Sequence, residues 1–136
     1  MNLFTYGTLM RGECRNEIMD YAKFLGTAYV YGQLYNYKRG GFPVLFNANN
    51  KGAGDKIFGE VYHIPDNLLE EYITLLDRIE GTAGGLYQKR GVTVTMEHDT
   101  DKTIHCFYYE GASTWINEGT GKPYNSLVRI TGRWNS

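Results

Sequence analysis

The sequence predicts an α+β fold: a small, mixed, mostly antiparallel curved sheet or barrel of about six strands, with one main helix packed on it. Three observations lead to this prediction. Short segments rich in β-branched and aromatic residues are separated by turns that contain Gly, Pro or Asn. A single longer segment has apolar residues at helical spacing. The chain has 136 residues, so we expect a single domain over 1–136.

Strands and turns alternate in the first third of the chain. A short strand is expected over 2–6 and ends at Gly7. Residues 17–22 are expected to form a short helix. The segment 24–37 is rich in Tyr, Val and Leu, which predicts one long strand or two, with Gly32 as a bulge or bend.

The central part of the chain leads from a turn to a further strand. A turn over 40–43 precedes the short apolar run 44–46. The segment 47–55 contains Asn, Gly and Lys without periodicity, which predicts an exposed loop. Residues 56–64 are then expected to form a strand.

The main helix is predicted over 66–81. Pro65 stops the preceding strand, Asp66 is suited to cap the start of the helix, and Gly81 is suited to end it. The apolar residues in between lie on one broad stripe at helical spacing. They are Leu68, Leu69, Tyr72, Ile73, Leu75, Leu76 and Ile79.

One acidic residue of this helix lies where an apolar residue is expected. At roughly 100° per residue, Glu80 projects among Leu69, Ile73 and Leu76. It also lies in the last turn, where the helix dipole disfavours an anion. Both effects are expected to raise the pKa of Glu80 towards neutrality, which suits a residue that exchanges protons. The alternative is a helix that frays by Ile79 and leaves Glu80 in water.

A β-hairpin is predicted after the helix. Residues 87–97 alternate between apolar and polar side chains, with Val92, Val94 and Met96 on one face. A polar loop over 98–102 joins this strand to its partner. The partner strand covers 103–109, and no structure is predicted for the Gly- and Asn-rich tail from 112 to 136.

Composition argues against several classes of protein. The net charge of -1 provides no basic surface for nucleic acid or an anionic membrane. No apolar run approaches the ~18 residues of a membrane span. Cys14 and Cys106 form no disulfide framework, and His63, His98 and His105 come from separate segments without acidic partners at metal spacing. We therefore expect a cytoplasmic protein with reduced thiols and no metal site.

The end of the first strand carries the motif Tyr6-Gly7-Thr8-Leu9. A glycine at this point lets successive backbone N–H groups converge on a concave anion site, and Gly7→Ala is expected to weaken binding if Gly7 needs a positive φ. Such a site suits a carboxylate or an oxyanion, and the alternative is a plain turn. Further along the chain, Tyr87 is suited to orient a ligand or Glu80. Arg90, three residues later on the same strand, is expected to face the opposite side.

Taken in order, these segments resemble the gamma-glutamyl cyclotransferase superfamily, most closely its short gamma-glutamylamine cyclotransferase-like (AIG2-like) branch. Residues 3–12 resemble the family's N-terminal Tyr-Gly-x-Leu signature, 42–43 its central Phe-Pro, and 59–62 the strand before its helix. Residues 75–81 and 87–90 resemble its Leu-Asp-x-x-Glu and Tyr-x-x-Arg elements. Each element alone is weak, but their order and spacing make the set specific.

The resemblance implies a small mixed-sheet barrel with flanking helices. It also implies a substrate-binding loop over 6–9 and Glu80 as the catalytic acid/base, and we add Tyr87 to the expected substrate-binding residues. The implied reaction releases 5-oxoproline and an amine from a small-molecule γ-glutamyl amine or γ-glutamyl peptide. It requires no metal and no organic cofactor.

Two other functions fit the pattern less well. One is a non-catalytic protein that uses the same pocket to bind a γ-glutamyl compound or another small carboxylate. The other is a barrel that binds nucleic acid, because tyrosines on curved sheets can stack on bases and the chain has 12 of them. The charge balance and the lack of a basic stripe argue against the second function.

Overall fold

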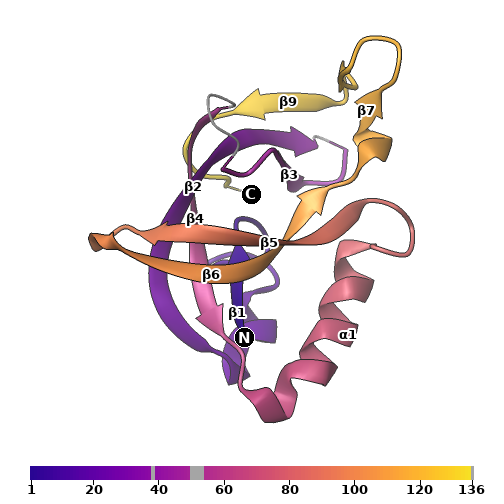
Figure 1. The fold of residues 1–136 in the computed structure, drawn as a ribbon. Coiled ribbons are helices and arrows are strands. Elements are labelled where there is room, and N and C mark those ends of the chain that lie inside the picture. Colours follow the sequence, from indigo (N-terminus) through magenta and orange to yellow (C-terminus); the bar gives the residue numbers. More distant parts are fainter. Residues whose placement is uncertain (38, 50–53, 136) are drawn as a thin grey trace.

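The computed structural model describes residues 1–37, 39–49 and 54–135. Within these residues the chain forms nine strands, one α-helix and three 3-10 helices (Figure 1). The strands are β1 (Asn2–Thr5), β2 (Lys23–Tyr37), β3 (Phe42–Phe46), β4 (Asp55–His63), β5 (Tyr87–Met96), β6 (Asp99–Gly111), β7 (Ile116–Asn117), β8 (Lys122–Pro123) and β9 (Leu127–Ile130). The helix is α1 (Leu69–Glu80), and the 3-10 helices are Asn16–Tyr21, Asp66–Leu68 and Ser113–Trp115.

Five strands close into a small barrel, in the order β2-β4-β1-β6-β5 and back to β2 (Figure 1). A short antiparallel pairing between β2 and β5 closes it, with Ala28 opposite Met96 and Tyr29 opposite Thr95. The other barrel pairs are antiparallel as well, except β1 and β6, which run parallel. This curved, mixed sheet with one main helix confirms the predicted α+β class.

Strand β2 is continuous and belongs to two parts of the sheet. Its first part pairs with β4, and its last residues lie between β3 and β9. The register shifts between Phe24 and Gly26, so the bulge predicted at Gly32 was wrong, whereas the alternative of a bend there stays a prediction. A Cβ on Gly32 would lie 3.0 Å from Leu45 Cδ1, so this glycine allows β3 to pack closely.

The hairpin that joins β5 to β6 is tighter than predicted. It turns at Glu97 and His98, and β6 already begins at Asp99, so the predicted loop over 98–102 was too long. The side chains here are exposed, but Asp99 already pairs with Met96, and the register shifts before Thr103 pairs with Thr95. Composition alone does not distinguish such a strand from a loop.

Two further segments complete the comparison with the sequence. The predicted loop over 47–55 includes residues 50–53, which lie outside the described residues, and Asp55 already belongs to β4. The tail, for which no structure was predicted, contributes the β7–β8 hairpin and the strand β9, which pairs with β2.

The helix α1 is shorter than predicted at its start. Asp66–Leu68 forms a 3-10 turn ahead of it, and Asp66 makes no capping hydrogen bond, so the predicted N-cap was wrong. Gly81 ends the helix with a φ of 65°, as expected for a left-handed terminal glycine. The helix is intact through Glu80, so the alternative of fraying by Ile79 was wrong. In the part of the chain that the structure describes, the helices are too short or too polar to cross a membrane.

The core has two layers of apolar side chains. The barrel interior contains Val92, Val94 and Met96, which confirms the predicted alternation of β5. A second cluster lies outside the barrel and includes Tyr72 and Leu76, which are buried on α1. Each such side chain contributes roughly 1.5–3 kcal/mol when fully buried. This second cluster therefore fixes the end of α1 against the barrel.

Candidate active site

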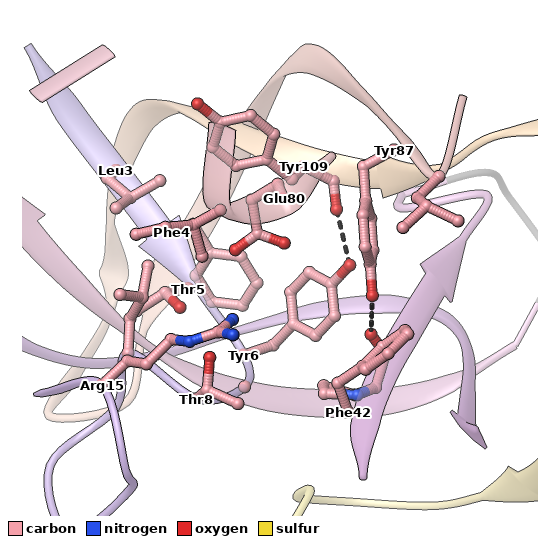
Figure 2. Close-up of a pocket in the computed structure, with 15 residues that line it drawn as sticks. Leu3, Phe4, Thr5, Tyr6, Thr8, Arg15, Phe42, Glu80, Tyr87 and Tyr109 are labelled. Carbon is pink, nitrogen blue, oxygen red and sulfur yellow. Dashed lines mark hydrogen bonds between the residues drawn. The ribbon is translucent and has the colours of Figure 1, made fainter. Parts of the chain in front are cut away.

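A pocket of about 110 Å³ opens where the first loop, the end of α1 and the start of β5 meet (Figure 2). The volume corresponds to several water molecules, which is enough room for part of a small ligand. The residues expected from the sequence all line this pocket. They are Tyr6, Gly7, Thr8, Leu9, Glu80 and Tyr87.

Glu80 is the last residue of α1 and supplies the carboxyl group of the pocket. Its side chain is partly buried and points toward Tyr6 and Arg15 (Figure 2). Burial removes water from the carboxylate and raises the pKa of Glu80 to about 7, while the positive charge of Arg15 opposes this rise. A carboxyl group with such a pKa can both accept and donate a proton near neutral pH.

The tyrosine rings of the pocket are held by their hydroxyl groups. Tyr6 Oη donates to the backbone oxygen of Tyr109 at 2.5 Å and accepts from the Leu45 N–H at 3.3 Å. Tyr87 Oη donates to the backbone oxygen of Pro43 at 2.5 Å. Burial, and then the neighbouring Glu80 charge, raise the pKa of Tyr87 well above its usual range. Tyr87 therefore builds the pocket wall with its hydroxyl already engaged.

The loop after β1 follows the pocket wall. The Gly7 backbone oxygen accepts from the Met10 N–H at 3.0 Å, and the Thr8 backbone oxygen accepts from the Arg15 N–H at 2.9 Å. Among the described residues, the N–H groups of Gly7, Thr8 and Leu9 donate to no other group of the chain. Three consecutive unpaired N–H groups beside a pocket suit an anionic ligand.

Gly7 is required for a different reason from the one expected. Gly7 is not among the glycines with positive φ, so a left-handed backbone is not the reason for a glycine here. A Cβ on Gly7 would lie 2.7 Å from Pro43 Cγ and 2.9 Å from Pro43 Cδ. The absence of a side chain at Gly7 thus allows the loop to lie directly against β3.

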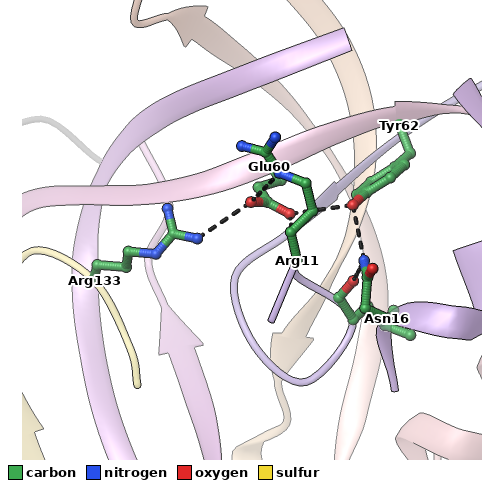
Figure 3. A network of polar contacts seen from close by, with 6 residues as sticks. Arg11, Asn16, Glu60, Tyr62 and Arg133 are labelled. Carbon is green, nitrogen blue, oxygen red and sulfur yellow. Dashed lines mark hydrogen bonds and ion pairs between the residues drawn. The ribbon is translucent and has the colours of Figure 1, made fainter. Parts of the chain in front are cut away.

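A buried carboxylate, that of Glu60, anchors the same loop (Figure 3). Glu60 on β4 has 0% of its surface exposed, and its Oε1 accepts from the Arg11 backbone N–H at 2.7 Å. Its Oε2 pairs with Arg11 Nε at 3.3 Å and with Arg133 Nη2 at 3.2 Å. Tyr62 Oη donates to Oε1 at 3.2 Å and accepts from Asn16 Nδ2 at 3.0 Å. Both ends of the chain therefore meet at one carboxylate that holds the first loop.

Sequence reasoning missed Arg15, Tyr109 and the role of Glu60. Arg15 and Tyr109 line the pocket, but Arg15 comes from a loop, where periodicity gives no position. Arg90, in contrast, faces away from the pocket as strand alternation predicted, and it pairs with Glu110 at 3.5 Å. Across the described ranges, no group of three His, Cys, Asp or Glu side chains gathers as a metal site would require.

The fold and the pocket define a class: a small barrel whose first loop and helix end enclose one carboxyl group with a raised pKa. The chain belongs to the gamma-glutamyl cyclotransferase, AIG2-like family, whose sequence model matches residues 3–134. This confirms the resemblance drawn from the motifs.

Individual relatives are similar over most of the chain. Gamma-glutamylaminecyclotransferase A of Danio rerio is 29% identical over 140 residues, which cover 97% of this chain and 81% of the relative. The crystal structure of an AIG2-like protein from Mus musculus has a TM-score of 0.67 at 24% identity and covers 99% of this chain and 97% of its own. An uncharacterized protein from Pyrococcus horikoshii has a TM-score of 0.61 at 24% identity, with coverage of 96% and 86%. The two structures support the fold.

Proposed function

We propose that this protein is an intramolecular cyclotransferase that releases 5-oxoproline and an amine from a γ-glutamyl amine or γ-glutamyl peptide. The family and the Danio rerio relative support this class of reaction. The observation that carries the proposal is Glu80, a carboxyl group in the pocket whose pKa is raised to about 7. The chemistry needs a proton carrier of this kind and uses no metal or organic cofactor.

The reaction begins with a folded substrate. The substrate must bend so that its α-amine reaches its own γ-carbonyl carbon, and holding this conformer contributes strongly to the rate. The unpaired N–H groups of Gly7, Thr8 and Leu9 are suited to bind the α-carboxylate and fix the bend. Tyr6 and Tyr87 then limit the space in which the chain can move.

Glu80 acts first as a base and then as an acid. Its carboxylate takes a proton from the α-ammonium, and the freed amine attacks the γ-carbonyl carbon. Glu80 then delivers a proton to the leaving nitrogen as the carbon–nitrogen bond breaks. Over the whole reaction the attacking nitrogen loses two protons and the leaving nitrogen gains two, so the products are a neutral lactam and an ammonium ion.

Negative charge develops on the γ-carbonyl oxygen when the ring closes. An N–H group of the loop over 6–9 that the α-carboxylate does not occupy is suited to stabilise it, and loss of such a donor costs ~10²–10³ in rate. The position of the loop therefore matters for the rate, and Glu60 holds it through the Arg11 backbone.

The cytoplasmic location stays a prediction that accompanies this function. Both cysteines are free, Cys14 exposed and Cys106 buried, which suits a reducing compartment. A small-molecule γ-glutamyl substrate would be met there.

The test is 5-oxoproline release from a panel of γ-glutamyl amines and γ-glutamyl dipeptides. We expect turnover by the unmodified protein and a loss of at least ~10²-fold in Glu80→Gln. Glu71→Gln, an exposed position on the same helix, is the matched control and should keep full activity. Saturable binding of the panel without product would instead support a non-catalytic binding protein. Full activity in Glu80→Gln would remove Glu80 from the mechanism.

A further inference from the structure

A guanidinium group lines the pocket beside Glu80. Arg15 lines the pocket, and its side chain reaches in from the first loop between Glu80 and Thr8 (Figure 2). The backbone fixes its position, since the Arg15 N–H donates to the Thr8 oxygen at 2.9 Å and the Arg15 oxygen accepts from the Ile18 N–H at 3.1 Å. Arg15 is therefore part of the pocket.

The guanidinium of Arg15 differs from those of four other arginines in its partners. Arg11, Arg90, Arg129 and Arg133 each pair with a carboxylate within 4 Å. Within the described residues, the Arg15 guanidinium makes no such pair, even with Glu80. It acts on Glu80 through space only, since its charge partly opposes the rise in the pKa of that residue. A free guanidinium that lines a pocket is suited to a ligand carboxylate, which it can bind through two parallel hydrogen bonds.

The proposed function places the leaving group of the substrate next to this cation. Three loop N–H groups are available for the α-carboxylate, and Glu80 must reach the leaving nitrogen. Because the exposed Arg15 side chain lies beside Glu80, the group attached to that nitrogen would come close to its positive charge (Figure 2). An anionic group there would meet a positive charge, and a cationic group would be repelled.

We propose that Arg15 selects γ-glutamyl substrates whose leaving amine carries a carboxylate, that is, γ-glutamyl amino acids or peptides, over γ-glutamyl derivatives of neutral or cationic amines. This inference rests on the proposed function. It assigns Arg15 a role in specificity and leaves the bond-forming steps to Glu80 and the loop.

The test compares two substrates that differ only in charge: γ-glutamyl-alanine and its C-terminal amide. We expect the unmodified protein to prefer the acid by about 10- to 100-fold in kcat/KM. This is the range that one hydrogen bond between Arg15 and the substrate carboxylate is expected to contribute. Arg15→Ala should lower kcat/KM for the acid by this factor and bring the ratio of acid to amide close to one. Any effect of the substitution on the pKa of Glu80 applies to both substrates and cancels in the ratio.

Two further variants make the result specific. Arg15→Lys keeps the charge and should retain part of the preference, while losing the planar two-bond geometry. Lys102→Ala removes one positive charge from the exposed β5–β6 hairpin and should leave the ratio unchanged.

Three outcomes would contradict the inference in different ways. Equal turnover of acid and amide by the unmodified protein would refute the selection by Arg15 and leave the proposed function intact. An equal loss on both substrates in Arg15→Ala would place Arg15 on the α-carboxylate instead. If the unmodified protein released no 5-oxoproline from either compound or from the wider panel, the proposed function would fail, and the role of Arg15 with it.

Discussion

Replacing Glu80 with Gln is expected to stabilise the protein at alkaline pH and to leave its stability unchanged in acid. Burial raises the pKa of Glu80 from 4.5 to about 7 in the folded chain. Between these two values the folded chain keeps a proton that the unfolded chain has released. Because the folded state binds the extra proton, its free energy of unfolding falls as the pH rises through this window.

The size of this loss follows from the difference between the two pKa values. One unit corresponds to about 1.4 kcal/mol, so a rise from 4.5 to about 7 lowers the free energy of unfolding by about 3 kcal/mol above pH 7. A glutamine has nearly the same shape and no charge at any pH, so the variant avoids the loss. At pH 8 the Glu80→Gln variant should be more stable than the unmodified protein by about 3 kcal/mol, or roughly 10 °C in Tm. At pH 4 the two proteins should be equally stable.

Urea unfolding of both proteins at pH 4, 6 and 8 measures this difference directly. Glu71→Gln serves as the control, because Glu71 is exposed in the first turn of α1, where the helix dipole favours an anion. That variant should lose less than about 1 kcal/mol at pH 8, a change of opposite sign. Equal stability of Glu80→Gln and the unmodified protein at pH 8 would show that Glu80 is solvated, and would refute its raised pKa.

The same titration should appear in the rate. With a pKa of about 7, the carboxylate fraction of Glu80 rises from about 10% at pH 6 to about 90% at pH 8. If Glu80 is the base, kcat/KM increases about tenfold over this range while the stability decreases. A flat profile of kcat/KM between pH 6 and 8 would contradict this assignment.

Two other substitutions test how the first loop is held. Gly7→Ala should destabilise by roughly 1–3 kcal/mol, because the new Cβ meets Pro43 Cγ at 2.7 Å. Gly84→Ala is the control, because a Cβ at Gly84 would lie 3.6 Å from its nearest neighbour, the Gly81 backbone oxygen. Equal urea midpoints for the two variants would argue against the close packing of Gly7. Glu60→Gln should lower kcat/KM, since the Arg11 N–H loses a charged acceptor and the first loop is held less firmly. It should also cost roughly 1–3 kcal/mol in urea unfolding, and an unchanged kcat/KM would count against this anchor.

Local patterns were enough to place the centre of the site. The 3.6-residue period put Glu80 among the apolar side chains of α1, and the structure shows it at the pocket. Strand alternation separated Tyr87 from Arg90, and the structure shows one in the pocket and the other on the surface. In each case the decisive information lies within one helix or one strand, so the sequence carries it directly.

Features that depend on distant contacts were not predictable in this way. Glu60 looks like an ordinary strand residue, and its partner Arg133 lies 73 positions further along the chain. Arg15 is placed by the path of a loop, and Gly7 by the approach of Pro43 from another strand. The hairpin at Asp99 was misjudged because exposed polar residues occur in strands and in loops alike. The positions of these residues depend on how distant segments come together when the barrel closes.

The carboxylate of Glu60 has a consequence for how the protein is made. Its two cationic partners, Arg11 and Arg133, come from opposite ends of the polypeptide. During synthesis the first loop emerges early, but the interaction with Arg133 cannot form until the chain has left the ribosome as far as that residue. Until then, Glu60 in the nascent protein lacks this second cationic partner, and the first loop is anchored less completely than in the folded protein.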